Sequence, residues 1–155
     1  MEKVHLTDLE SRMGPADVKR QLSRALGAEH VSVNYYELAP GEAFGFGNHR
    51  HADQEELFYV QSGTATIETE DGDVTVGAGE AIRFAPGEWQ LGRNDGEDRV
   101  VALALGAPQA TGDTEMHRDC PECDERTRHT IEMAEGRDAL LTRCSVCGVE
   151  TGRYT

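Results

Sequence analysis

The stretch His49-Arg50-His51-Ala52-Asp53-Gln54-Glu55-Glu56, followed by Gly63, decides how this sequence folds and what it can bind. Side chains two residues apart on a β-strand point to the same face, so His49 and His51 aim both imidazoles at one point. Residues 52–54 have the composition of a turn, after which a second strand brings Glu56 alongside. Two histidines and one carboxylate form the facial triad typical of non-haem Fe(II) sites, and the same donors suit Mn, Ni or Zn.

On either side of this stretch, short runs in which apolar and polar residues alternate predict a mainly β fold. Turns rich in Gly, Asn and Asp separate the runs, a pattern typical of a β-sandwich or barrel. The expected strands cover residues 31–38, 56–61, 64–69, 74–76, 80–84, 89–93 and 99–105, with a hairpin turn at 71–72. Before them, apolar positions at helical spacing predict one helix over residues 16–26, and Gly27 is suited to its C-cap.

All four cysteines lie near the C-terminus, as the pairs Cys120/Cys123 and Cys144/Cys147. Two Cys-x-x-Cys pairs separated by 20 residues predict a tetrahedral four-thiolate zinc site. A rubredoxin-like iron site, two disulfides or redox-active pairs are the alternatives, and a reducing compartment disfavours structural disulfides. A tail of this size is too small to build a hydrophobic core, so a metal would supply the missing folding free energy.

Composition divides the chain into four parts: an arm and helix over 1–30, a β domain over 31–106, a small, polar linker over 107–116 and the cysteine module over 117–155. Residues 1–116 carry a net charge of −12 and residues 117–155 only −2, which sets the tail apart.

The whole chain is strongly acidic, with a net charge of −14 and only two lysines, Lys3 and Lys19. Such a composition is typical of halophilic proteins, in which negative charge maintains solubility. The same charge argues against binding to nucleic acid or to an anionic membrane. No apolar run is long enough to span a membrane, and the first residues lack a signal-peptide pattern, so a cytoplasmic location is expected.

Two motifs resemble those of the cupin superfamily over residues 31–106. In the first, four residues separate His51 from Glu56 and six separate Glu56 from Gly63, which selects Glu56 rather than Glu55 as the carboxylate ligand. The second runs from Gly79 to Asn94, but Ala85 replaces its proline and Gln90 occupies the position of the usual fourth ligand, a histidine. The resemblance implies a double-stranded β-helix (a jelly-roll barrel) with the site inside, and a homodimer.

Gln90 leaves three interpretations of this site open. Its amide oxygen could be a fourth ligand, and this hard donor favours Fe(II), Mn or Ni over softer metal ions. It could instead form a hydrogen bond to a metal-bound water or to a substrate. In the third interpretation the barrel binds an organic ligand, or nothing.

The tail resembles a zinc ribbon whose second knuckle ends in Cys147-Gly148. A ribbon closed by Cys120, Cys123, Cys144 and Cys147 leaves no open coordination position, so its zinc is expected to be structural.

These features favour a metal-dependent enzyme that performs a dioxygenase-like or isomerase-like reaction on a small polar metabolite. The predicted divalent metal (Fe, Mn, Ni or Zn) is held by His49, His51 and Glu56, with Gln90 as the uncertain ligand; no catalytic acid or base is identifiable. The alternative is a non-catalytic module that senses a ligand or metal and contacts a protein partner through residues 117–155. A purely structural role is a third hypothesis.

Overall fold

The computed structural model describes residues 1–155 and shows a mainly β protein. It has thirteen strands, one short helix, α1 (Leu22–Leu26), and a single 3₁₀ turn, η1 (Leu6–Asp8). Neither helical segment is long or apolar enough to cross a membrane.

The largest sheet of the β domain is antiparallel and has the strand order β1-β2-β9-β4-β7. Its members are β1 (Val18–Gln21), β2 (Ser32–Leu38), β4 (Glu55–Ser62), β7 (Ala81–Phe84) and β9 (Val100–Ala107). Alternate residues of the central strand β9 are buried, as expected for a sheet with one face on the core.

A three-stranded sheet of order β6-β5-β8 covers the other side of the core. It consists of β5 (Thr64–Thr69), β6 (Gly72–Gly77) and β8 (Leu91–Arg93). Side chains from both sheets meet in one cluster of 13 buried residues, among them Leu38, Val60, Ile67 and Val100, which are fully buried.

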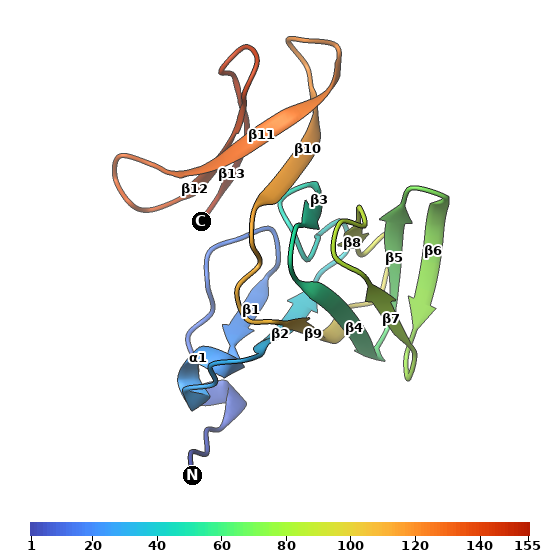
Figure 1. The fold of residues 1–155 in the computed structure, drawn as a ribbon, viewed down its shortest axis with the longest axis vertical. Coiled ribbons are helices and arrows are strands. Elements are labelled where there is room, and N and C mark those ends of the chain that lie inside the picture. The colour runs from blue at the N-terminus through green and yellow to red at the C-terminus, as the bar shows by residue number, and fades with distance from the viewer.

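The third sheet joins the C-terminal tail to the histidine strand (Figure 1). Its order is β13-β12-β11-β10-β3, with β3 (Asn48–His51), β10 (Thr114–Cys120), β11 (Glu125–Met133), β12 (Leu140–Cys144) and β13 (Glu150–Tyr154). Thr114 lies opposite His51 and Met116 opposite His49, so the tail continues the strand that carries both histidines. The tail has only a three-residue core of its own, Ala134, Ala139 and Leu141.

Two expectations about the ends of the β domain need correction. The helix predicted over residues 16–26 is confined to Leu22–Leu26, and Val18–Gln21 is a strand, because its backbone pairs with the edge of β2. Gly27 does cap the helix, with a φ of 66°. The stretch 107–116 was expected as a linker, but β10 already begins at Thr114, because its backbone pairs with β3.

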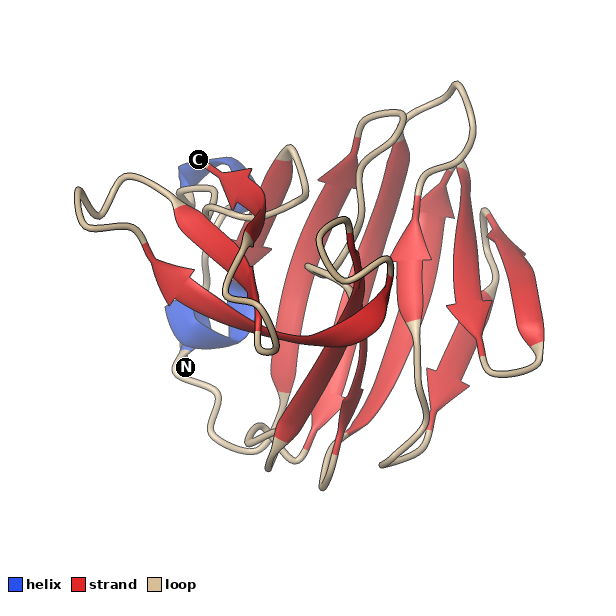
Figure 2. Cartoon of the chain, turned by 90° about the horizontal axis from the view of Figure 1, so that it is seen from above, coloured by secondary structure: helices blue, strands red, loops and turns tan.

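The central strands match the expectation closely, and Thr64–Thr69 forms a strand with the predicted bounds. The tight turn after it centres on Glu70 and Asp71, one residue earlier than predicted, because Thr69 pairs with Gly72. The strands, drawn in red in Figure 2, form three hydrogen-bonded sheets rather than one closed ladder. One isolated bridge joins His49 of β3 to Gln90, just before β8, and another joins Ala43 to Arg93 of β8.

Candidate metal centre

Strand β3 carries the two histidines, and its alternation points both imidazoles to one side, with ring centroids 5.0 Å apart. Glu56, the second residue of β4, faces them. Its Oε2 lies 3.5 Å from His51 Nε2 and 3.9 Å from His49 Nε2. The predicted triad therefore converges, with its three donor atoms within 4.8 Å of one another.

These separations can be compared with those that a bound ion requires. Two ligands about 2.1 Å from one ion lie about 3.0 Å apart at a right angle and about 3.4 Å apart at a tetrahedral angle. The observed 3.5 and 3.9 Å are slightly wider. The donor set, two neutral imidazoles and a carboxylate, fits a divalent transition metal.

Gln90 completes the cluster from the loop before β8, where a two-way backbone bridge to His49 fixes its position. The residue is 1% exposed. Its Nε2 donates to Glu56 Oε2 at 2.6 Å and lies 3.3 Å from His49 Nε2, while its Oε1 is buried with no hydrogen-bond partner. A half-turn of the amide would exchange the two atoms and present that oxygen to the position between Glu56 and His49.

Hydrogen bonds on the far side of each ring fix the orientation of the histidines. His49 Nδ1 donates to the Gly47 carbonyl oxygen at 2.9 Å, which leaves Nε2 of the neutral ring as an acceptor. Burial lowers the pKa of His49, and the Glu56 carboxylate offsets part of that effect. His51 Nδ1 lies 2.9 Å from the hydroxyl oxygen of Thr114, a residue of the tail strand β10. Such outer partners hold ligating histidines in their binding orientation.

A cavity of about 250 Å³ opens beside the cluster. Aromatic side chains of Tyr36, Phe44 and Phe58 form its apolar wall. The segments on either side of the β domain also contribute, with Lys19 from β1 and Ile131 from the tail strand β11. Its size is below the roughly 300–1,000 Å³ of pockets for drug-sized ligands, so it suits a small metabolite.

Several other residues considered from the sequence lie outside this cluster. Glu55 forms a surface ion pair with Arg83, with 2.6 Å between Oε2 and Nε. Arg50 points the opposite way from the two histidines, contacts Glu115 at 2.8 Å and lies over the ring of Trp89.

Three contributors to the site escaped the sequence prediction: Lys19, Thr114 and Ile131. Thr114 and Ile131 reach the cavity only because β10 pairs with β3, and no local pattern reports a pairing between strands 63 residues apart. The only feature of the sequence that sets Lys19 apart is that the chain has just two lysines.

A wider and more open hollow of about 660 Å³ lies between the N-terminal segment, residues 41–48 and the tail. It holds no cluster of metal donors. Arg118 lines this hollow and donates hydrogen bonds to the carbonyl oxygens of Phe46 and Thr151 and to the Tyr154 hydroxyl. We call this set of bonds, which ties the tail to residues 41–48, the Arg118 clamp. The ring of Tyr154 also packs edge-on against Phe46, with centroids 5.0 Å apart.

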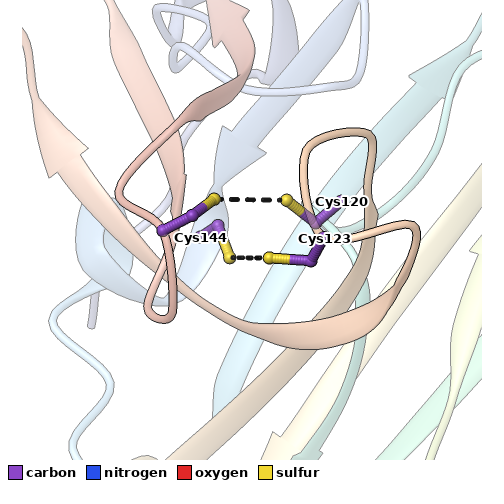
Figure 3. Close-up of side chains that lie close together, drawn as sticks. Cys120, Cys123 and Cys144 are labelled. Carbon is purple, nitrogen blue, oxygen red and sulfur yellow. Dashed lines mark hydrogen bonds between the residues drawn. The ribbon is translucent and has the colours of Figure 1, made fainter.

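The four cysteines of the tail form a second donor cluster (Figure 3). All are free thiols, with 3.5 Å between the sulfurs of Cys120 and Cys147 and 3.8 Å between those of Cys123 and Cys144. Two thiolates bound tetrahedrally to zinc lie about 3.8 Å apart. Hydrogen bonds, first from the Thr127 hydroxyl, lower the pKa of Cys144 to about 5, whereas burial and the neighbouring thiols raise the pKa of Cys123. The cluster fits a tetrahedrally bound metal ion.

Residues 34–106 match the sequence profile of the cupin domain. No curated protein matches the chain.

Solved structures share the fold at low sequence identity. A sugar phosphate isomerase of the cupin superfamily from Silicibacter pomeroyi is 18% identical and aligns over 99% of this chain and 92% of its own, with a TM-score of 0.65. A polyketide cyclase from Streptomyces resistomycificus is 24% identical over 81% and 91%, with a TM-score of 0.64. A predicted oxalate decarboxylase from Thermotoga maritima is 19% identical over 69% and 99%, with a TM-score of 0.60.

Proposed function

We propose that this chain, whose residues 34–106 carry a cupin domain, is a metal-dependent enzyme that acts on a small polar molecule. One observation carries the proposal: the donor atoms of His49, His51 and Glu56 converge in the wall of a cavity of metabolite size. Similarly folded proteins described as an isomerase, a cyclase and a decarboxylase are consistent with small-molecule chemistry.

The residues of this chain would hold the ion and the substrate in different ways. His49, His51 and Glu56 would ligate a divalent metal, and the buried amide oxygen of Gln90 is available to join them. When bound, such a metal supplies Lewis-acid polarisation of a substrate oxygen or, if it is iron, a centre for O₂ chemistry. Gly47 and Thr114 keep the imidazoles oriented, and Tyr36, Phe44 and Phe58 give the cavity an apolar wall.

The cysteine cluster has a supporting role in this proposal. Zinc held by four thiolates has no open position for chemistry. It would fix the tail, whose β10 supplies Thr114 behind His51 and whose β11 supplies Ile131 to the cavity.

A turnover panel tests the proposal. Protein loaded separately with Fe(II), Mn(II), Ni(II) or Zn(II) is assayed with small hydroxy acids, keto acids and sugars, with and without O₂. We expect turnover with at least one metal, loss of that turnover in His51→Ala, and its retention in Tyr59→Phe, which alters an exposed side chain 40% accessible to solvent. Turnover that survives equally in His51→Ala would contradict the proposal.

One contact supports a second candidate function, a sensor of metal or ligand. Because β10 pairs directly with β3, occupancy of the histidine site acts on the same sheet as the cysteine cluster. A sensor would bind its ligand without turning it over, and the tail would show a ligand-dependent change in hydrogen exchange. Turnover combined with an unchanged exchange pattern in residues 117–155 would exclude this role.

A further inference from the structure

The cavity beside the metal-donor cluster has a second charged group, Lys19. Among the residues that line the cavity, Lys19 is the only lysine or arginine and Glu56 the only carboxylate. Lys19 lies on β1, outside the residues that match the cupin profile, so the family match does not account for it.

The fold places Lys19 beside a buried tyrosine. Lys19 of β1 pairs with Tyr36 of β2, so both side chains project from the same face of the sheet toward the cavity. Lys19 Nζ lies 5.4 Å from the centroid of the Tyr36 ring, and Tyr36 is 5% exposed. Burial raises the pKa of Tyr36, so its hydroxyl remains a hydrogen-bond donor at neutral pH.

Lys19 and Tyr36 contact each other, and neither polar group forms an ion pair or a hydrogen bond with a third residue. Lys19 Nζ takes part in none of the ion pairs, although the chain has 29 acidic residues. Beyond its contact with Lys19 the Tyr36 hydroxyl makes no hydrogen bond, whereas that of its neighbour Tyr35 donates to Glu37 at 3.0 Å. A half-buried ammonium and a phenol that share a cavity, contact each other and have no acidic partner are suited to an external anion.

We propose that Lys19 and Tyr36 form an anion subsite, and that the substrate is a small carboxylate whose remaining polar groups face His49, His51 and Glu56. This inference rests on the proposed function and specifies its substrate class. Both groups line the same cavity of about 250 Å³, so a small molecule that fills it contacts Lys19 as well as the donor cluster.

The composition of the subsite favours a carboxylate over a phosphate. One ammonium and one hydroxyl match the single charge of a carboxylate. Phosphate recognition in proteins usually recruits arginine forks or a helix N-terminus, and this cavity has neither. The inference therefore separates this chain from the sugar phosphate isomerase that shares its fold.

Amine footprinting of the full-length, zinc-containing protein tests the subsite directly, because the chain has only two lysines. Acetic anhydride labels exposed amines, and mass spectrometry measures the labelling of Lys19 against Lys3, which lies on the exposed N-terminal arm. We expect lactate to slow labelling of Lys19 but not of Lys3, and neutral glycerol to slow neither. Equal labelling of Lys19 with and without lactate would overturn the inference. Stronger protection by glycerol 3-phosphate than by lactate would overturn the assignment to carboxylates.

Calorimetric titration with lactate then measures the contribution of the side chain. In Lys19→Met the affinity should fall about tenfold or more, because a charge-assisted hydrogen bond is lost, while Lys19→Arg should retain part of it. Lys3→Met is the matched control and should bind as the wild type does. Circular dichroism establishes that each variant is folded, and the footprint of the wild type does not depend on any substitution.

The same titrations separate this inference from the proposed function. Lactate binding that depends on Lys19 with the cavity free of metal supports the subsite whether or not the protein is an enzyme. Metal-dependent turnover with an unchanged KM in Lys19→Met would leave the proposed function in place and overturn the subsite.

Discussion

Gly63, the last residue of the first motif, should be among the least replaceable positions of the chain. It joins β4 to β5 with a φ of 76°, in the left-handed region that favours glycine. A Cβ at this position would lie 2.5 Å from the backbone oxygen of Arg99 and 3.0 Å from the Cα of Val100. Both neighbours are backbone atoms at the start of the central strand β9, so neither can rotate away.

Gly79→Ala provides the matched control for Gly63→Ala. Gly79 has a φ of 86°, but a Cβ there would meet no atom within 4 Å. Gly79→Ala should therefore lose only about 1–2 kcal/mol of unfolding free energy, the cost of holding an alanine in the left-handed backbone conformation. Gly63→Ala adds the overpacking cost, a further 1–3 kcal/mol or so.

Urea unfolding followed by circular dichroism at fixed zinc concentration measures both free energies. We expect Gly63→Ala to be destabilised by about 2–5 kcal/mol and to be clearly less stable than Gly79→Ala. Equal losses in the two variants would refute the argument that close approach to Arg99 requires glycine at position 63.

Three further predictions concern the histidine site, the tail and its clamp. Because the pKa of His49 is lower in the folded protein than in the unfolded chain, the unfolded chain binds more protons, and stability should fall as the pH drops from 7 through about 6.5. Urea unfolding of protein without metal in the cavity, from pH 5 to 8, should show a weaker pH dependence in His49→Asn. Cys120→Ser should lose the tail zinc and increase hydrogen exchange in β11 and β12; unchanged zinc content would contradict the four-thiolate site. Arg118→Met should lower the unfolding free energy by about 1.5–3 kcal/mol, since the clamp to Phe46 and Tyr154 is lost, and an unchanged value would show that the clamp is not stabilising.

Local patterns predicted the parts of the fold that depend on local physics. The alternation of β-branched residues located the strand Thr64–Thr69, and the histidine spacing placed His49 and His51 on one face. The two cysteine pairs also predicted the cluster that the structure shows.

Long-range pairing accounts for what the sequence could not predict. Val18 has helical spacing with Leu22, Ala25 and Leu26, yet Val18–Gln21 forms a strand because its backbone pairs with the edge of β2. A short segment follows such tertiary pairing rather than its own weak propensity. In the same way, residues 114–116 have the small, polar composition of a linker but extend the histidine strand.

The composition of the site follows from those two pairings. They bring Lys19 from one end of the chain, and Thr114 and Ile131 from the other, to the cavity. Ligand types and spacing could therefore be predicted from the sequence, whereas the walls of the cavity required the fold.

Elemental analysis of untagged protein tests the central claim most directly, that His49, His51 and Glu56 hold a divalent metal separate from the tail zinc. Wild type is compared with His49→Ala/His51→Ala, and Arg50→Ala serves as the control, because Arg50 lies between the histidines but points away from them. We expect two metal ions per chain in wild type and in Arg50→Ala, and one zinc per chain in the double variant. One zinc per chain in all three proteins would contradict the account and leave the cavity without a metal.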